Sequence, residues 1–128
     1  MSGLLLDTHA MLWLLDDHPR LGPAARAAIM HPDTTVYVSA ASPWEFQVKL
    51  WSRGRAVEHD LLDRLDALGL STLPISAADG LTAGSLPLHH RDPFDRMLVA
   101  QCMEHDLTLM TVDRVMREYD IRVFPAAA

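Results

Sequence analysis

The sequence predicts an α/β fold in which a central parallel sheet carries helices on its faces. Two observations support this class. Short apolar segments alternate along the 128 residues with longer segments of helical character, which is the order expected of a parallel sheet with crossover helices. The first apolar segment, residues 4–6, is also a continuous run of leucines, which is typical of a buried strand.

Five segments are predicted as strands. Residues 4–6 end at Asp7, and residues 36–38 combine two valines with a tyrosine, the β-branched and aromatic mixture that strands favour. The other predicted strands are residues 73–75, 107–111 and 121–124.

Helices are predicted between these strands from their capping residues. Ser42 can cap a helix whose first turn holds Pro43, and Glu45 falls at the capping-box position three residues after the cap. Asp92 is predicted to cap a later helix in the same way, before Pro93. The predicted helices span residues 9–15, 23–30, 43–52, 59–68, a segment from 76, 93–104 and 113–118.

Composition narrows the class of protein. The length fits one domain, predicted to comprise residues 1–128. The formal charge of −6 argues against broad, charge-driven binding of nucleic acid, although a nucleic acid could still be bound through a metal ion. No segment approaches the roughly 20 apolar residues of a membrane span, and the single cysteine, Cys102, excludes an internal disulfide. We therefore expect a cytoplasmic protein without membrane contact.

Four separate carboxylates fall where a predicted strand runs into a helix. They are Asp7, Glu45, Asp95 and Asp113. In an open α/β sheet these junctions converge on one edge, where ligands bind. Four acids at one place repel each other unless a cation lies between them, and hard oxygen ligands favour Mg²⁺, with Mn²⁺ as a possible substitute. Such a site suits phosphoryl chemistry with a metal-activated water.

Each acid also has an alternative, structural interpretation. Glu45 could complete a capping box, Asp95 could stabilise the first turn of its helix through the helix dipole, and Asp113 could cap the last short helix. Asp7 has the weakest structural explanation, because a carboxylate that ends an apolar strand has little structural reason to be there.

Neighbouring polar residues leave further alternatives open. His89 and His90 could form a metal or acid–base pair, but we favour a solvated loop before Asp92. His9 could reach the site or lie on a helix surface. Arg91 and Arg96 could contact phosphate or could balance the charge of the acids. Thr8, Ser39 and Thr111 could support the carboxylates or could simply cap helices.

Four motifs in order resemble the PIN-domain ribonucleases, specifically the VapC-type toxins of bacterial toxin–antitoxin pairs. They are LLLDTHAMLWLL, SAASPWEFQVK, LPLHHRDPFDRMLVAQC and LTLMTVD, and they cover nearly the whole chain. The resemblance implies a three-layer α/β/α PIN-like domain in which the four acids form the catalytic, metal-binding pocket. It implies Asp7 and Asp95 as principal Mg²⁺ ligands, with Glu45 and Asp113 completing the pocket.

The same resemblance implies an activity and partners. The activity is Mg²⁺-dependent endonucleolytic cleavage of RNA, and the partners are a second copy of the chain and a cognate antitoxin protein. Two alternatives stay open, a receiver-type Mg²⁺-binding signalling domain and a non-catalytic PIN-like binding module. A receiver domain normally has an acidic pair after its first strand and a late lysine. This sequence fits that pattern poorly, because Asp7 is followed by Thr8 and Lys49 is the only lysine.

Overall fold

The computed structural model describes residues 3–56 and 59–128 and contains a five-stranded parallel sheet. The strand order is β3-β2-β1-β4-β5, and every neighbouring pair is parallel. The strands are β1 (Gly3–Leu6), β2 (Thr35–Ser39), β3 (Ser71–Leu73), β4 (Thr108–Thr111) and β5 (Arg122–Pro125). This arrangement confirms the predicted α/β class with a central parallel sheet.

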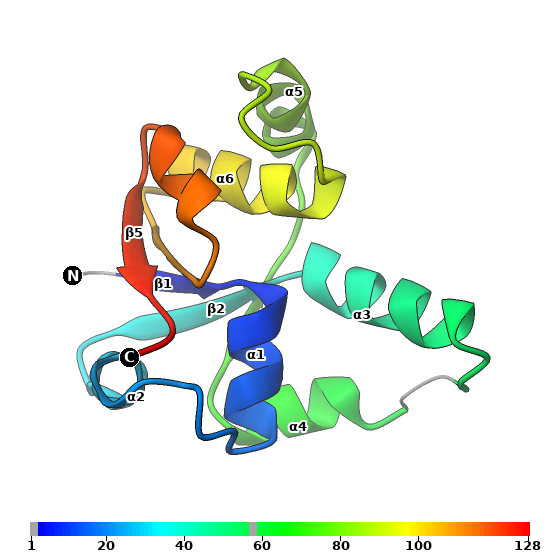
Figure 1. Cartoon of the computed structure of the whole chain (residues 1–128), viewed down its shortest axis with the longest axis vertical. Helices are drawn as coiled ribbons and strands as arrows, with labels where there is room; N and C mark the ends of the chain where they lie inside the picture. The colour runs from blue at the N-terminus through cyan, green and yellow to red at the C-terminus, as the bar shows by residue number, and fades with distance from the viewer. Residues whose placement is uncertain (1–2, 57–58) are drawn as a thin grey trace.

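Helices cover both faces of the sheet (Figure 1). Helices α1, α2 and α4 lie on one side, and α6 lies on the other with α5 stacked outside it. The helices are α1 (Thr8–Leu15), α2 (Pro23–Met30), α3 (Ala41–Ser52), α4 (Leu61–Ala67), α5 (Ala77–Ser85) and α6 (Pro93–His105), followed by the 3₁₀ helix η1 (Arg114–Glu118). The layers are therefore the α/β/α set that the sequence predicted.

The central strand β1 explains why the sheet is buried on both faces. Leu4 and Leu6 belong to the apolar cluster formed with α1, α2 and α4, whereas Leu5 belongs to the cluster formed with α6 and η1. All three leucines are fully buried. Because successive side chains of a strand point to opposite faces, a run of three leucines supplies both cores at once.

The predicted strand at residues 73–75 is displaced in the structure. The edge strand β3 ends at Leu73, whose carbonyl accepts a hydrogen bond from the Ala40 amide. Pro74 follows and has no N–H with which to continue the ladder. Helix α4 is also shorter than predicted, spanning Leu61–Ala67 within the predicted 59–68.

The strand order places a crevice between β1 and β4. The chain proceeds from β1 to β2 on one side, and β4 pairs with β1 on the other, so connections leave in opposite directions at this point. Such a switch point opens a crevice at the carboxyl ends of the strands. Asp7 follows β1 directly, its amide bonded to the Met110 carbonyl of β4, and Asp113 follows β4 by two residues.

None of the helices within residues 3–56 and 59–128 combines the length and apolar character that crossing a bilayer requires.

We expect Leu5→Ala to lower the free energy of unfolding by about 2–5 kcal/mol, because it leaves a cavity at a fully buried position. Chemical denaturation measures this change. Leu81→Ala is the matched control, since that side chain is 79% exposed and its removal should change stability little. Equal effects of the two substitutions would contradict the assigned core.

Candidate metal centre

Asp7 is buried at the start of α1, with only 5% of its surface exposed. Its Oδ1 accepts a hydrogen bond of 2.7 Å from the Ala10 amide, so Asp7 is the N-cap of α1. The expectation that Asp7 has little structural role is therefore wrong. Burial raises the pKa of this carboxyl above its ordinary value, while hydrogen bonds from Thr111 and Ala10 act in the opposite direction.

Glu45 is also buried, and both of its carboxylate oxygens have donors. Thr8 Oγ1 donates to Oε1, and Lys49 Nζ lies 2.9 Å from Oε2. The predicted capping box with Ser42 is wrong, because α3 begins at Ala41 and Ser42 already lies inside its first turn. Ser42 Oγ has no hydrogen-bond partner among residues 3–56 and 59–128. Glu45 is thus oriented by Thr8 and Lys49, not by a cap.

Asp95 and Asp113 are joined by a histidine. His90 Nε2 lies 3.1 Å from Asp95 Oδ2 and 2.9 Å from Asp113 Oδ2. Asp95 sits in the first turn of α6, which Asp92 caps as predicted. Asp113 caps η1 through Oδ1, which accepts from the Val115 amide. The favoured interpretation of His90 as a solvated loop residue is therefore wrong.

The hydrogen bonds of His90 assign its tautomer. The Asp92 amide donates to His90 Nδ1 over 3.0 Å, so Nδ1 carries the lone pair and the ring proton lies on Nε2. His90 therefore donates through Nε2 to Asp113 Oδ2, while Asp95 Oδ2 lies 3.1 Å from the same nitrogen. One ligand atom each from His90, Asp95 and Asp113 lies within 4.8 Å of the others, a spacing that could hold a metal ion. A metal bound at His90 Nε2 would, however, require the ring proton on Nδ1, and Nδ1 already accepts the hydrogen bond from the Asp92 amide. The geometry favours an orienting donor over a metal ligand.

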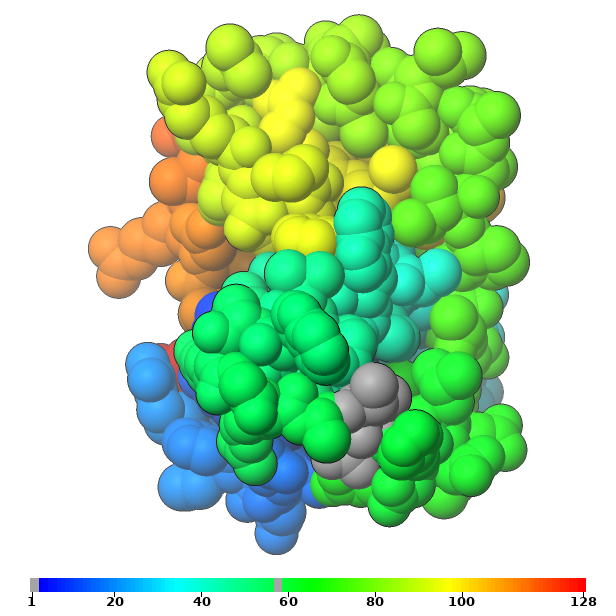
Figure 2. Space-filling model, turned by 90° about the vertical axis from the view of Figure 1, so that its right-hand side faces the viewer, coloured from blue at the N-terminus to red at the C-terminus, as the bar shows by residue number. Residues whose placement is uncertain are grey.

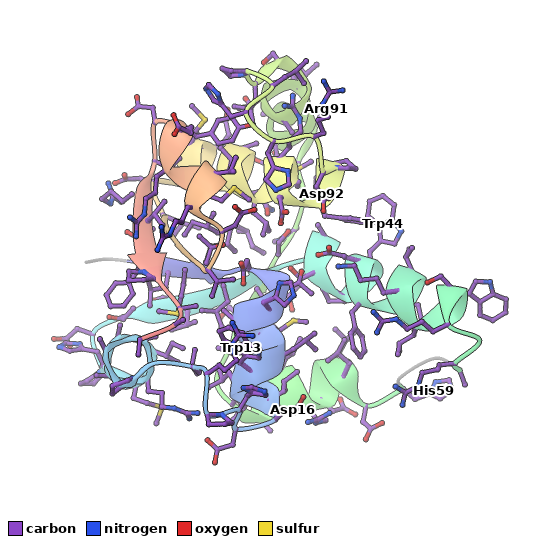
Figure 3. All side chains as sticks on the ribbon, viewed as in Figure 1. Trp13, Asp16, Trp44, His59, Arg91 and Asp92 are labelled. Carbon is purple, nitrogen blue, oxygen red and sulfur yellow. The ribbon has the colours of Figure 1, made fainter. Side chains whose placement is uncertain are left out.

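The loop that carries His90 is fixed by two side chains. Tyr119 donates through its hydroxyl to the Pro87 carbonyl and accepts from the His90 amide. Arg96 donates to four main-chain carbonyls, those of Ala83, Leu86, Pro87 and His90. Arg96 thus serves neither of its two predicted roles: its guanidinium is used to hold the loop. Arg91, labelled in Figure 3 beside Asp92, is exposed and forms no ion pair within the described part of the chain.

The other neighbouring residues support individual elements. Ser39 Oγ accepts from the Ala41 amide, which is a simple capping contact at the start of α3. Thr111 Oγ1 accepts from the Asp113 amide, and its side chain also bonds Asp7, so it links two of the acids. His9 is exposed on α1, in agreement with the helix-surface interpretation.

Three of the four carboxylates, Asp7, Glu45 and Asp95, influence one another electrostatically. Burial, followed by the charge of Asp92 and then those of Glu45 and Asp7, raises the pKa of Asp95 to about 7, with His90 acting in the opposite direction. Glu45 likewise raises the pKa of Asp7. A cation among these groups would relieve both the desolvation and the repulsion. The all-oxygen donor set fits a hard divalent ion such as Mg²⁺.

Comparison with known proteins identifies the family. The model of the PIN domain matches residues 4–122, and the chain belongs to the PIN-domain family. It is 32% identical over 122 residues to ribonuclease VapC22 of Mycobacterium tuberculosis, an alignment that covers 93% of each protein. The predicted family is confirmed, and so is the predicted enzyme class, because PIN-domain proteins are nucleases. Family membership also removes the receiver-domain alternative.

Solved structures share the fold. VapBC2 of Rickettsia felis, bound to a DNA fragment from its promoter, matches with a TM-score of 0.73 at 14% identity, covering 96% of this chain and 98% of that one. FitAcB of Neisseria gonorrhoeae matches with a TM-score of 0.66 at 20% identity, covering 96% and 97%. At these identities the likeness establishes the three-layer fold.

We expect Asp95→Asn to stabilise the chelator-treated protein above pH 7. Because the folded-state pKa of Asp95 is raised, wild-type stability should fall as pH rises from about 4 to 7. The variant lacks this titration, so its advantage should grow across that window to a few kcal/mol. Urea denaturation at several pH values measures it, with the exposed Asp33→Asn as control. Parallel curves for wild type and Asp95→Asn would contradict the assigned pKa.

A double-mutant cycle separates an orienting donor from a metal ligand at His90. Because an orienting donor acts through Asp113, His90→Ala should weaken Mn²⁺ binding by roughly tenfold or more in the wild-type chain but little in an Asp113→Ala background, whereas loss of a direct ligand would weaken binding in both. Electron paramagnetic resonance of free Mn²⁺ measures the affinity. His31→Gln, at an exposed position, is the control. An equal loss of Mn²⁺ affinity in both backgrounds would refute the donor assignment.

Proposed function

We propose that this chain, as one PIN domain over residues 1–128, is a divalent-metal-dependent endoribonuclease and the toxin of a toxin–antitoxin pair. The observation that carries the proposal is the convergence of Asp7, Glu45, Asp95 and Asp113 at the carboxyl edge of β1 and β4. Similarity to a protein named as a ribonuclease supports RNA as the substrate. Structural likeness to toxin–antitoxin complexes supports the biological role.

The hydrogen bonds of the acids suggest which of them would bind the metal ion directly and which would contact its water. Asp7 and Asp95 would be the principal ligands of Mg²⁺, or of Mn²⁺ as a substitute. Both oxygens of Glu45 already accept hydrogen bonds, which suits contact with a metal-bound water better than direct ligation. Asp113, held by His90 and the Val115 amide, would complete the pocket.

The metal would supply the chemistry that the side chains lack. When bound, it lowers the pKa of a coordinated water and neutralises charge on the phosphate oxygens. The protein's own contribution is to keep the carboxylates in place. Thr8 and Lys49 orient Glu45, while the Ala10 amide and Thr111 orient Asp7. These donors hold the acids in position before the metal or RNA arrives.

An exposed apolar stripe supports the proposal of protein partners. Trp44, Val48 and Trp51 are 62%, 46% and 74% exposed, and their spacing places them along one side of α3. Figure 2 looks onto α3, and the ring of Trp44, labelled in Figure 3, packs edge-on against Phe94 of α6 while most of its surface stays exposed. Large exposed apolar side chains mark interaction surfaces. We propose a cognate antitoxin and a second copy of the chain as partners, acting in the cytoplasm.

Metal-dependent cleavage is the direct test. With Mg²⁺ the wild-type chain should cut RNA internally, and chelator, Asp7→Asn or Asp95→Asn should each reduce the rate by at least about 100-fold, because each removes the cation or a ligand. Gel analysis of labelled RNA measures the rate, and Asp33→Asn should behave as wild type.

Two other outcomes would each reject a part of this proposal. Cleavage that persists in both chelator and Asp7→Asn would exclude the metal mechanism. Mg²⁺ binding without cleavage of any RNA would favour the remaining alternative, a non-catalytic PIN-like binding module.

A further inference from the structure

The 3₁₀ helix η1 distributes its residues among three faces. A 3₁₀ helix has about three residues per turn, so residues three apart lie above one another. Met116 and the following Tyr119 are buried in the apolar cluster beneath α6. Arg114 and Arg117 share a second, exposed face, and Glu118 lies on the third. The two guanidinium groups are thus presented on the same side of η1, while the core contacts of η1 anchor it.

The face with the two arginines lines a pocket of about 280 Å³ beside the metal centre. Figure 1 shows the orange segment that contains η1 next to β5. The walls come from the end of β4, from η1 and from β5, and include Thr111, Asp113, Arg114, Arg117, Val123 and Pro125. Asp113 belongs to both sites: it lines this pocket and bonds His90 in the acidic cluster. The pocket and the metal centre therefore adjoin.

Four of the 11 basic residues form ion pairs with acids within the described part of the chain, and Arg114 and Arg117 are not among them. The pairs are Arg26–Asp17, Lys49–Glu45, Arg64–Asp16 and Arg122–Asp106. Neither Arg114 nor Arg117 forms an ion pair within residues 3–56 and 59–128. Two unpaired guanidinium groups around one pocket suit an anionic ligand, and their planar donor sets match phosphate geometry.

We infer that this pocket binds a backbone phosphate of the RNA strand, next to the phosphate held at the metal centre. The inference rests on the proposed function. An RNA strand whose scissile phosphate lies among the four acids must place its neighbouring phosphates against the adjoining surfaces. In a chain of net charge −6, only local cations can offset the repulsion of these phosphates. Arg114 and Arg117 are therefore binding residues that position the strand without reading its sequence.

The test compares Arg114→Ala/Arg117→Ala with a charge-matched control, Arg20→Ala/Arg55→Ala. Both control arginines are exposed and lie outside this pocket. For metal-dependent cleavage of single-stranded RNA, we expect KM of the pocket variant to rise roughly tenfold and kcat to stay within about twofold of wild type. RNA binding, measured by fluorescence anisotropy in an Asp95→Asn background, should show a salt slope smaller by about 1.4 for two lost phosphate contacts.

Each further outcome distinguishes this inference from the proposed function. If the pocket variant matches the control in KM and salt slope while wild type cleaves RNA, the phosphate pocket is refuted and the ribonuclease stands. A loss confined to kcat would also refute it. If wild type cleaves no RNA but the salt slopes differ as expected, the pocket stands and the ribonuclease fails. Absence of RNA binding by the chain would overturn the inference outright.

Discussion

Repulsion among the closely placed and largely buried carboxylates of Asp7, Glu45 and Asp95 is the constraint on which the site and much of the surrounding structure depend. Two of the acids, Asp7 and Glu45, are almost fully buried, where an uncompensated charge is costly. Hydrogen-bond donors to the carboxylates offset part of this cost. They are main-chain amides at the starts of α1 and η1, the hydroxyl of Thr8, the ammonium of Lys49 and the imidazole of His90. The raised pKa values of Asp7 and Asp95 indicate that these donors compensate only in part.

The same contacts make the acids part of the fold. Asp7 caps α1 and Asp113 caps η1, so a substitution at either position removes a helix cap as well as a charge. The two effects oppose each other, because relief of repulsion stabilises the folded chain while loss of a cap typically costs about 1 kcal/mol. Asp95 differs: it lies in the first turn of α6, where Asp92 provides the cap. A change at Asp95 therefore reports the electrostatics of the crevice most directly.

Sequence patterns predicted the layers, most elements and the junctions at which the acids lie, because those features depend on local periodicity and capping. The sequence patterns failed where tertiary contacts determine the local structure and the role of a side chain. The role of His90 depends on a loop that is held by Arg96 of the following helix α6 and by Tyr119 from beyond β4, and no local motif encodes that geometry. Local chemistry allowed a capping box between Ser42 and Glu45 as an alternative to the metal site, but α3 begins earlier and Thr8 of α1 donates to the Glu45 carboxylate. Edge strand β3 was displaced because its pairing with β2 set its register.

An acidic protein that handles a polyanion must separate two tasks in space. Carboxylates are needed to hold a divalent cation, yet they repel every phosphate that the cation does not neutralise. Here Asp113 marks the boundary, facing the acidic cluster through His90 and the η1–β5 pocket on its other side. Because the buried side chains of Met116 and Tyr119 anchor η1, Arg114 and Arg117 form no ion pairs with the four carboxylates. The packing of η1 thereby keeps the two arginines apart from the carboxylates, although their opposite charges attract each other.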